Sequence, residues 1–295
     1  VFSRFTADDA FISWRYGKNL VDAGIWAFNP SAFDATQAYT NPIFAALSII
    51  PNLLGWDVVL FFKLFSFAVL GLFALWARTL LSGSGLLLVA FIALPATMIH
   101  VFAGLETFVF VFAMAALLIA LHRHQLARSI WLTLLLFVTR PEAWVLVVLV
   151  PVYYLFSDHT REYQGSLVQR IRGFLSGQTL QPARAFVVAA ALVIPLGVYF
   201  FFHLQHFGHA LPNTFYIKAN DGFNAVLFLS FGFFLLPALA LLFTRQIKMA
   251  GFILALFGAI LLSYSTSSLS MNYAARFAYH IFGPCFIYFV YLASR

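Results

Sequence analysis

The feature of this sequence that most limits its fold is a succession of long apolar runs separated by short polar breaks. A helix needs roughly 20 mostly apolar residues to cross a bilayer, and it satisfies its own backbone polar groups there. The runs are residues 57–77, 86–99, 104–121, 128–139, 142–156, 185–203, 224–243, 249–264 and 278–292. They predict an all-α fold, a polytopic transmembrane helical bundle that forms one domain over residues 1–295.

The composition supports a membrane protein and argues against a nucleic-acid partner. Hydrophobic residues make up 63% of the chain and charged residues 9%. The net charge is +7, but the basic residues are scattered through short loops and do not form a groove with aromatic side chains. The single cysteine, Cys285, excludes a disulfide within the chain.

One apolar stretch and the two ends of the chain depart from the pattern of simple spans. Proline interrupts the stretch YTNPIFAALSIIPNLLGW at positions 42 and 51, so we expect an interfacial or re-entrant helix there. The chain starts at Val1 without a methionine or signal peptide and ends at Arg295 just after an apolar run. We therefore expect it to be truncated at both termini.

The distribution of cations predicts an orientation in the membrane. Threading the runs alternately places one group of basic residues on a single side: Arg78, Arg123, Arg128, Arg161, Arg170, Arg172, Arg184, Arg245, Lys248 and Arg295. The positive-inside rule makes this side cytoplasmic. Most carboxylates then fall at the outer side, namely Asp8, Asp9, Asp22, Asp34, Asp57, Glu106, Glu142 and Asp221. Because separate pieces of chain bring ionisable groups to one face, we expect a polar cavity roofed from outside.

The opening segment TADDAFISWRYGKNLVDAG is predicted to form a short helix of about four turns on the outer membrane face. Thr6 and Asp9 have the spacing of an N-cap pair, and Gly24 is a suitable C-cap. Capping would explain Asp9 without any function, whereas Asp8 has no such role. A carboxylate at a helix start stays ionised, which suits a catalytic base or a metal ligand.

The stretch TRPE at 139–142 carries charge between two apolar runs. Pro141 ends the preceding helix and leaves Arg140 and Glu142 at a break at membrane depth. Arg140 is therefore either a structural strut paired with Glu142 or Glu106, or a site for an anionic ligand. Lys218 and Arg276 add two more cations to the outer face, where a phosphate with a lipid tail is a natural partner.

The ordered motifs DDAFISWRYGKNLVDAGIWAFNP, AYTNP, GLET, TRPE, LPNTFYIKA and ARF resemble those of GT-C glycosyltransferases. They are most similar to the arabinofuranosyltransferase B family of the actinobacterial cell wall and to related pilin arabinosyltransferases. The resemblance runs from about residue 6 to about residue 284. It differs at the termini, because those relatives carry an N-terminal span before the DD loop and usually a soluble C-terminal domain.

The resemblance implies an enzyme of the bacterial cytoplasmic membrane with its active site on the extracytoplasmic side. It would move a sugar, expected to be arabinofuranose, from a polyprenyl-phosphate donor to a glycan or glycoprotein acceptor. Carried over to this sequence, the catalytic carboxylate is Asp8 or Asp9. The donor phosphate would be held by Arg140, Lys218 and Arg276, and further residues of the cavity would be Tyr39, Glu106, Glu142, Asn213 and Tyr216.

Two points stay open in the sequence. A flippase or transporter that binds a polyprenyl lipid would share the Arg and Lys residues, although the chain shows no internal repeat and a binder would not need Asp8. No cofactor is certain. A divalent cation is left open, because His100 and Glu106 lie near one outer end without metal-ligand spacing.

The orientation can be tested by labelling single cysteines in a Cys285→Ser background. The basic loop 157–184 should be cytoplasmic and the loop near Asn213 external. In intact cells, a membrane-impermeant thiol reagent should label Asn213→Cys and not Ser166→Cys. The reverse pattern would overturn the orientation and the position of the site.

Overall fold

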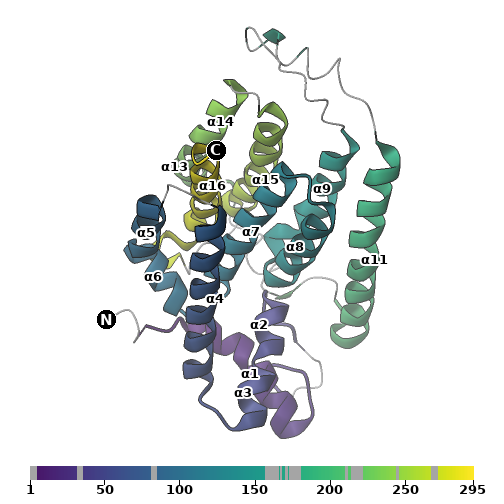
Figure 1. The fold of residues 1–295 in the computed structure, drawn as a ribbon. Helices are drawn as coiled ribbons and strands as arrows, with labels where there is room; N and C mark the ends of the chain where they lie inside the picture. The colour runs from purple at the N-terminus through teal and green to yellow at the C-terminus, as the bar shows by residue number, and fades with distance from the viewer. Residues whose placement is uncertain are drawn as a thin grey trace.

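The structure, a computed structural model, describes residues 5–31, 36–80, 85–156, 166, 168–169, 172, 181–209, 212–213, 222–243, 246–266 and 272–295. These residues form helices and no β-strand, which confirms the all-α prediction (Figure 1). The first eight helices are α1 (Asp8–Ala23), α2 (Pro42–Leu47), α3 (Ile49–Leu54), α4 (Val58–Leu80), α5 (Gly85–Ala93), α6 (Pro95–Phe102), α7 (Thr107–His122) and α8 (Leu126–Thr139). They are followed by η2 (Pro141–Val145), α9 (Leu146–Leu155), α11 (Pro182–Phe207), α13 (Ala225–Gly232), η3 (Phe233–Leu235), α14 (Leu236–Ala240), η4 (Leu241–Phe243), α15 (Ile247–Ser265), η5 (Tyr273–Ala275) and α16 (Arg276–Ala293).

Three helices in the described part of the chain are long and apolar enough to cross a membrane. They lie at Val58–Thr79, Pro182–Phe207 and Ile247–Ser265. A fourth span results if α5 and α6, which are bent by 63° before Pro95, are taken together. The sequence 39–56 forms the two six-residue helices α2 and α3 instead of one continuous helix: Pro42 is the first residue of α2, and Pro51 has no N–H to donate to the carbonyl of Leu47, where α2 ends. A membrane protein is thus supported, with fewer full-length spans than apolar runs.

The opening helix is present, but its predicted N-cap is wrong. α1 begins at Asp8, its N-cap residue is Ala7, and no side chain caps it. The backbone N–H of Ala7 instead donates to the carbonyl of Ala103, at 2.9 Å, which fixes the start of the helix from outside. Gly24 is the C-cap as predicted, with a φ of 70° and its N–H bonded to the carbonyl of Leu20.

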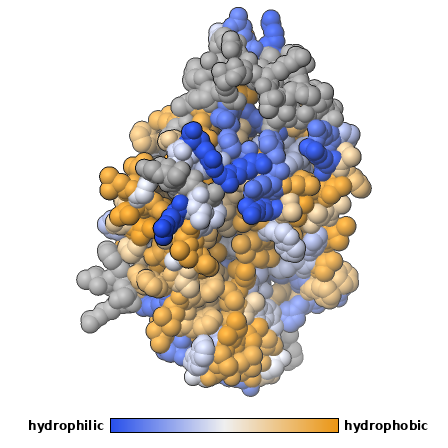
Figure 2. All heavy atoms as spheres, in the orientation of Figure 1, coloured by the Kyte–Doolittle hydropathy of each residue, from blue (hydrophilic) through white to orange (hydrophobic). Residues whose placement is uncertain are grey.

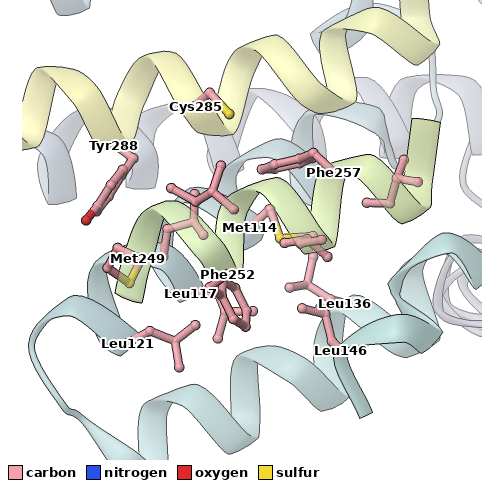
Figure 3. Packing of buried hydrophobic residues seen from close by; sticks show 14 of the residues in the cluster. Met114, Leu117, Leu121, Leu136, Leu146, Met249, Phe252, Phe257, Cys285 and Tyr288 are labelled. Atoms are coloured by element: carbon pink, nitrogen blue, oxygen red, sulfur yellow. The ribbon is translucent and has the colours of Figure 1, made fainter. Parts of the chain in front are cut away.

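The apolar core is built around α7. Twelve of its sixteen residues are buried, so this helix is surrounded on all sides by protein. Its side chains pack against α8, α9, α15 and α16, and Figure 3 shows the contact of Met114 and Leu117 with side chains of these neighbours. By contrast, α4 and α11 bury few of their side chains, as expected of helices that face lipid.

Helices α1, α2 and α3 form a layer at one end of this bundle (Figure 1). The described carboxylates lie at this end, namely Asp8, Asp9, Asp22, Asp57, Glu106 and Glu142. The opposite end carries Arg78, Arg123, Arg128, Arg184, Lys248 and Arg295. Arg15, Lys18, Arg140 and Arg276 also lie at the carboxylate end, so the two ends differ in net charge, and the orientation in the membrane stays a prediction. The labelling positions 166 and 213 are exposed, and Cys285 is buried.

The layer depends on a close approach of α1 to α3 at Gly17. A Cβ at this position would lie 2.2 Å from Ser48 Oγ and 2.6 Å from the Ser48 carbonyl carbon. The backbone atoms cannot move aside without shifting a helix, so only glycine fits.

We expect Gly17→Ala to lower the free energy of unfolding by about 1–3 kcal/mol, the usual cost of overpacking. Gly71→Ala is the matched control, because a Cβ at Gly71 meets nothing within 4 Å. It should be neutral or stabilising by about 0.5–1 kcal/mol, since alanine is the better helix former. Melting of the purified protein in detergent measures both, and equal melting temperatures would contradict the close packing of α1 on α3.

Candidate functional site

The charged residues of four sequence motifs meet at helix ends next to the α1 layer. Glu106 is the N-cap residue of α7, and Glu142 lies in the first turn of η2 after Pro141. Asp9 lies in the first turn of α1. Carboxylates are stabilised at helix N-termini by the partial positive charge of the free N–H groups. Arg140, at the C-cap of α8, occupies the position that favours a cation.

Glu106 is the centre of this arrangement, and its side chain is fully buried. Its Oε1 accepts from Arg140 Nη1 at 2.5 Å and from Arg276 Nη2 at 2.9 Å. Its Oε2 accepts from Asn41 Nδ2 at 2.6 Å. A buried carboxylate costs several kcal/mol unless it is paired and hydrogen-bonded, and here both oxygens have partners from other helices. We call Asp9, Asn41, Glu106, Arg140, Glu142 and Arg276 the Glu106 cluster.

Arg140 is held on both sides by carboxylates. Its Nη2 and Nε bind Glu142 Oε1 and Oε2 at 2.7 and 3.0 Å, a bidentate pair, while Nη1 binds Glu106. Pro141 makes this possible, because it forces Arg140 into an extended conformation and turns the chain into η2. These are the contacts that the strut interpretation of Arg140 requires.

Arg276 joins the cluster to the first helix. Its Nε donates to Thr107 Oγ1 at 3.2 Å, and its Nη1 lies 3.6 Å from Asp9 Oδ2. The Asp9 side chain is 29% exposed, against 6% for Arg276, so this ion pair reaches toward solvent. Arg276 follows Ala274 and Ala275, which have φ values of 47° and 53°. Two successive non-glycine residues in the left-handed region are strained, and such strain is concentrated at functional sites.

The charges of the Glu106 cluster do not cancel. Arg140 and Arg276 are balanced by Glu106 and Glu142, and Asp9 is one carboxylate in excess. The two arginines therefore need no further anion for their neutrality. An anionic ligand at Arg276 would have to compete with Asp9 for the guanidinium group.

Sequence reasoning did not select Asn41, although it lies in the quoted stretch AYTNP. Its Oδ1 accepts from Ser13 Oγ at 2.5 Å while its Nδ2 binds Glu106, so it links α1 to the cluster. Asn41 is also the N-cap residue of α2, directly before Pro42. The Asn-Pro pair could have indicated a helix start, but nothing in the sequence pointed to Glu106 as its partner.

Other predicted site residues lie elsewhere. Asp8 is exposed, and its Oδ1 accepts only from the backbone N–H of Asp9 among the described residues. Tyr39 is buried against Tyr16, and Trp26 Nε1 donates to its hydroxyl at 3.2 Å. Burial raises the pKa of Tyr39 to about 12, which keeps the hydroxyl protonated at neutral pH. The exposed Asn213 donates its backbone N–H to Gln37.

Two further predicted residues, Lys218 and Tyr216, lie outside the described residues. Within the described ranges, no three His, Cys, Asp or Glu side chains are grouped so as to hold a metal ion. The divalent cation that the sequence leaves open stays an untested possibility.

Comparison of the chain with models of known protein families, with curated proteins and with solved structures finds no match.

The cluster makes a prediction about stability. Glu106→Gln removes the negative charge shared by two buried arginines, so it should lower the free energy of unfolding by about 3–5 kcal/mol. Asp22→Asn is the matched control, because it breaks the exposed i,i+4 pair with Lys18 and should cost at most about 0.5 kcal/mol. Thermal melting of both variants in detergent tests this, and a Glu106→Gln protein as stable as the control would show that the arginines do not depend on Glu106.

Proposed function

We propose that this chain is a membrane glycosyltransferase of the GT-C type. In this proposal it moves a sugar, arabinofuranose by the motif resemblance, from a polyprenyl-phosphate carrier to a glycan or glycoprotein acceptor outside the cytoplasmic membrane. The observation that carries the proposal is the meeting of five separate motifs in one cluster. Asp9, Asn41, Glu106, Arg140 and Arg276 come from DD, AYTNP, GLET, TRPE and ARF, respectively.

Asp9 is the proposed catalytic base, in preference to Asp8. In the transfer, an acceptor hydroxyl oxygen forms a bond to the anomeric carbon, the bond from that carbon to the phosphate oxygen breaks, and polyprenyl phosphate leaves. Asp9 takes the hydroxyl proton. It is partly exposed and its Oδ2 lies 3.6 Å from Arg276 Nη1, whereas Asp8 is exposed and has no ion pair among the described residues.

The two described arginines then have different roles. Arg276 is the proposed contact of the donor phosphate, together with Lys218, and it neutralises the charge that develops on the leaving group. A phosphate that reaches Arg276 displaces the 3.6 Å contact with Asp9 and so frees the base when the donor is bound. Arg140 is the strut that holds Glu106 and Glu142 in place.

A lipid-binding flippase or transporter remains the second candidate. The observation in its favour is the broken helix pair α5 and α6, with its 63° bend, because interrupted helices often line transport pathways. A carrier of this kind needs the cations for its lipid ligand but has no use for a base at Asp9.

We expect Asp9→Asn to lower sugar transfer by about a hundredfold or more, the usual scale for loss of a general base. Asp8→Asn, which makes the same change on the neighbouring residue, should keep most of the activity. The measurement is mass spectrometry of glycans formed by membranes that contain each variant and are fed a polyprenyl-phosphate sugar. Transfer at the wild-type rate by Asp9→Asn would exclude Asp9 as the base.

Donor binding separates the two arginines. Arg276→Gln should weaken binding of the polyprenyl-phosphate donor by roughly 1.5–3 kcal/mol, the value of a charge-assisted hydrogen bond. Arg140→Gln should instead lower the melting temperature of the empty protein, with little change in donor affinity once the folded fraction is counted. Unchanged donor affinity in Arg276→Gln would count against the phosphate assignment, and donor binding without any transfer in the wild type would favour the carrier.

A further inference from the structure

We propose that the end of the molecule opposite the Glu106 cluster binds the phosphate of an anionic phospholipid. The site is formed by Arg123, at the turn between α7 and α8, and by Arg295, which follows α16. The two arginines lie on the same aromatic ring, that of Tyr291. This proposal is independent of glycosyl transfer and would hold equally for a carrier.

The geometry brings two cations to one ring. Arg123 Nε donates to the Tyr291 hydroxyl at 3.0 Å, and its guanidinium carbon is 5.3 Å from the ring centroid. The guanidinium carbon of Arg295 is 5.4 Å from the same centroid. Both distances are within the range of cation–π attraction. The two guanidinium groups carry like charge, and an anion that contacts both would relieve their mutual repulsion.

Further cations surround the same turn. His124 has a φ of 54°, and its ring stacks on Tyr153 with a centroid distance of 6.4 Å. Lys248 Nζ lies 4.0 Å from the centroid of that Tyr153 ring. Arg128 is exposed in the first turn of α8. Three permanent cations, Arg123, Lys248 and Arg295, thus lie on aromatic rings beside the turn between α7 and α8, and Arg128 lies at the same end of the molecule outside this group.

No described Asp or Glu side chain lies at the end of the molecule that carries Arg123 and Arg295. All six described carboxylates lie at the other end of the molecule, as noted above. Asp158 and Glu162, which the sequence places on the basic side, are outside the described residues. The charge of the described surface therefore complements an anion.

The surroundings favour a lipid phosphate as that anion. The cations lie at the ends of apolar helices, and Trp131 on α8 exposes 72% of its surface nearby, as aromatic side chains do at the membrane–water boundary. Figure 2 shows hydrophilic residues gathered in the upper half of the visible face, above a broad apolar surface. Basic residues in this position attract the headgroups of anionic lipids.

The test is native mass spectrometry of the purified chain in detergent, with phosphatidylglycerol or phosphatidylcholine added. The wild type should retain phosphatidylglycerol in preference to phosphatidylcholine. Arg123→Gln and Arg295→Gln should each reduce phosphatidylglycerol binding about fivefold, the effect of one cation at an anionic headgroup. Arg295 is exposed, so its substitution leaves the fold intact even if Arg123→Gln destabilises it.

Two controls separate a defined site from general surface charge. Arg128→Gln removes the same charge at the same end but away from the Tyr291 ring, and Arg15→Gln removes a cation that lies 4.6 Å from the Phe28 ring at the other end. Both should bind phosphatidylglycerol almost as the wild type does. An equal loss in Arg128→Gln and Arg295→Gln, or equal retention of both lipids by the wild type, would overturn the proposal.

Discussion

One buried carboxylate, Glu106, joins the helix ends that meet beside the layer of α1, α2 and α3. Through a single oxygen it accepts hydrogen bonds from Arg140 and Arg276, and through the other it accepts from Asn41. Each partner belongs to a different helix end, and removing any of these charges from water costs several kcal/mol unless it is paired. The helix ends at this site therefore depend on all of these partners together. Along the rest of α7 the contacts are apolar, and apolar packing tolerates substitutions that keep the side-chain volume.

The interruptions of the helices are what make this pairing possible. Pro141 breaks the chain where Arg140 must reach two carboxylates, and the left-handed Ala274 and Ala275 precede Arg276. A continuous helix would bury its backbone groups but could not aim these side chains at a common point. The same breaks expose helix termini, whose partial charges stabilise Glu106 and Glu142. The strain at the two alanines and the burial of charge thus occur in one place.

Much of this arrangement could be predicted from the sequence. An apolar run indicates a helix that is buried in lipid or in the protein core, and this inference does not require knowing which segments it packs against. The runs are helical, although 86–99, 142–156 and 224–243 are each divided into shorter helices, and the motifs placed Glu106, Glu142 and the two arginines at one end, where the structure brings them together. The pairing of Arg140 with Glu106 was one of two interpretations open in the sequence, but other contacts between distant segments could not be predicted. The start of α1 is held by the Ala103 carbonyl and not by the predicted cap at Thr6. Asn41 is uncharged, so the search for ionisable residues did not select it. Tyr39 packs against Tyr16 in a neighbouring aromatic group.

The lengths of the helices determine how deep the cluster lies in the membrane. At about 1.5 Å per residue, the 16 residues of α7 measure about 24 Å, and the 26 residues of α11 measure about 39 Å. The hydrocarbon core of a bilayer is about 30 Å thick, so α7 is too short to cross it, whereas α11 is longer than the crossing requires. A phosphate at Arg276 would therefore sit below the level of neighbouring headgroups. Either the lipid tail would have to bend, or the bilayer would have to become thinner around the protein. The free-energy cost of such thinning depends on the thickness of the membrane.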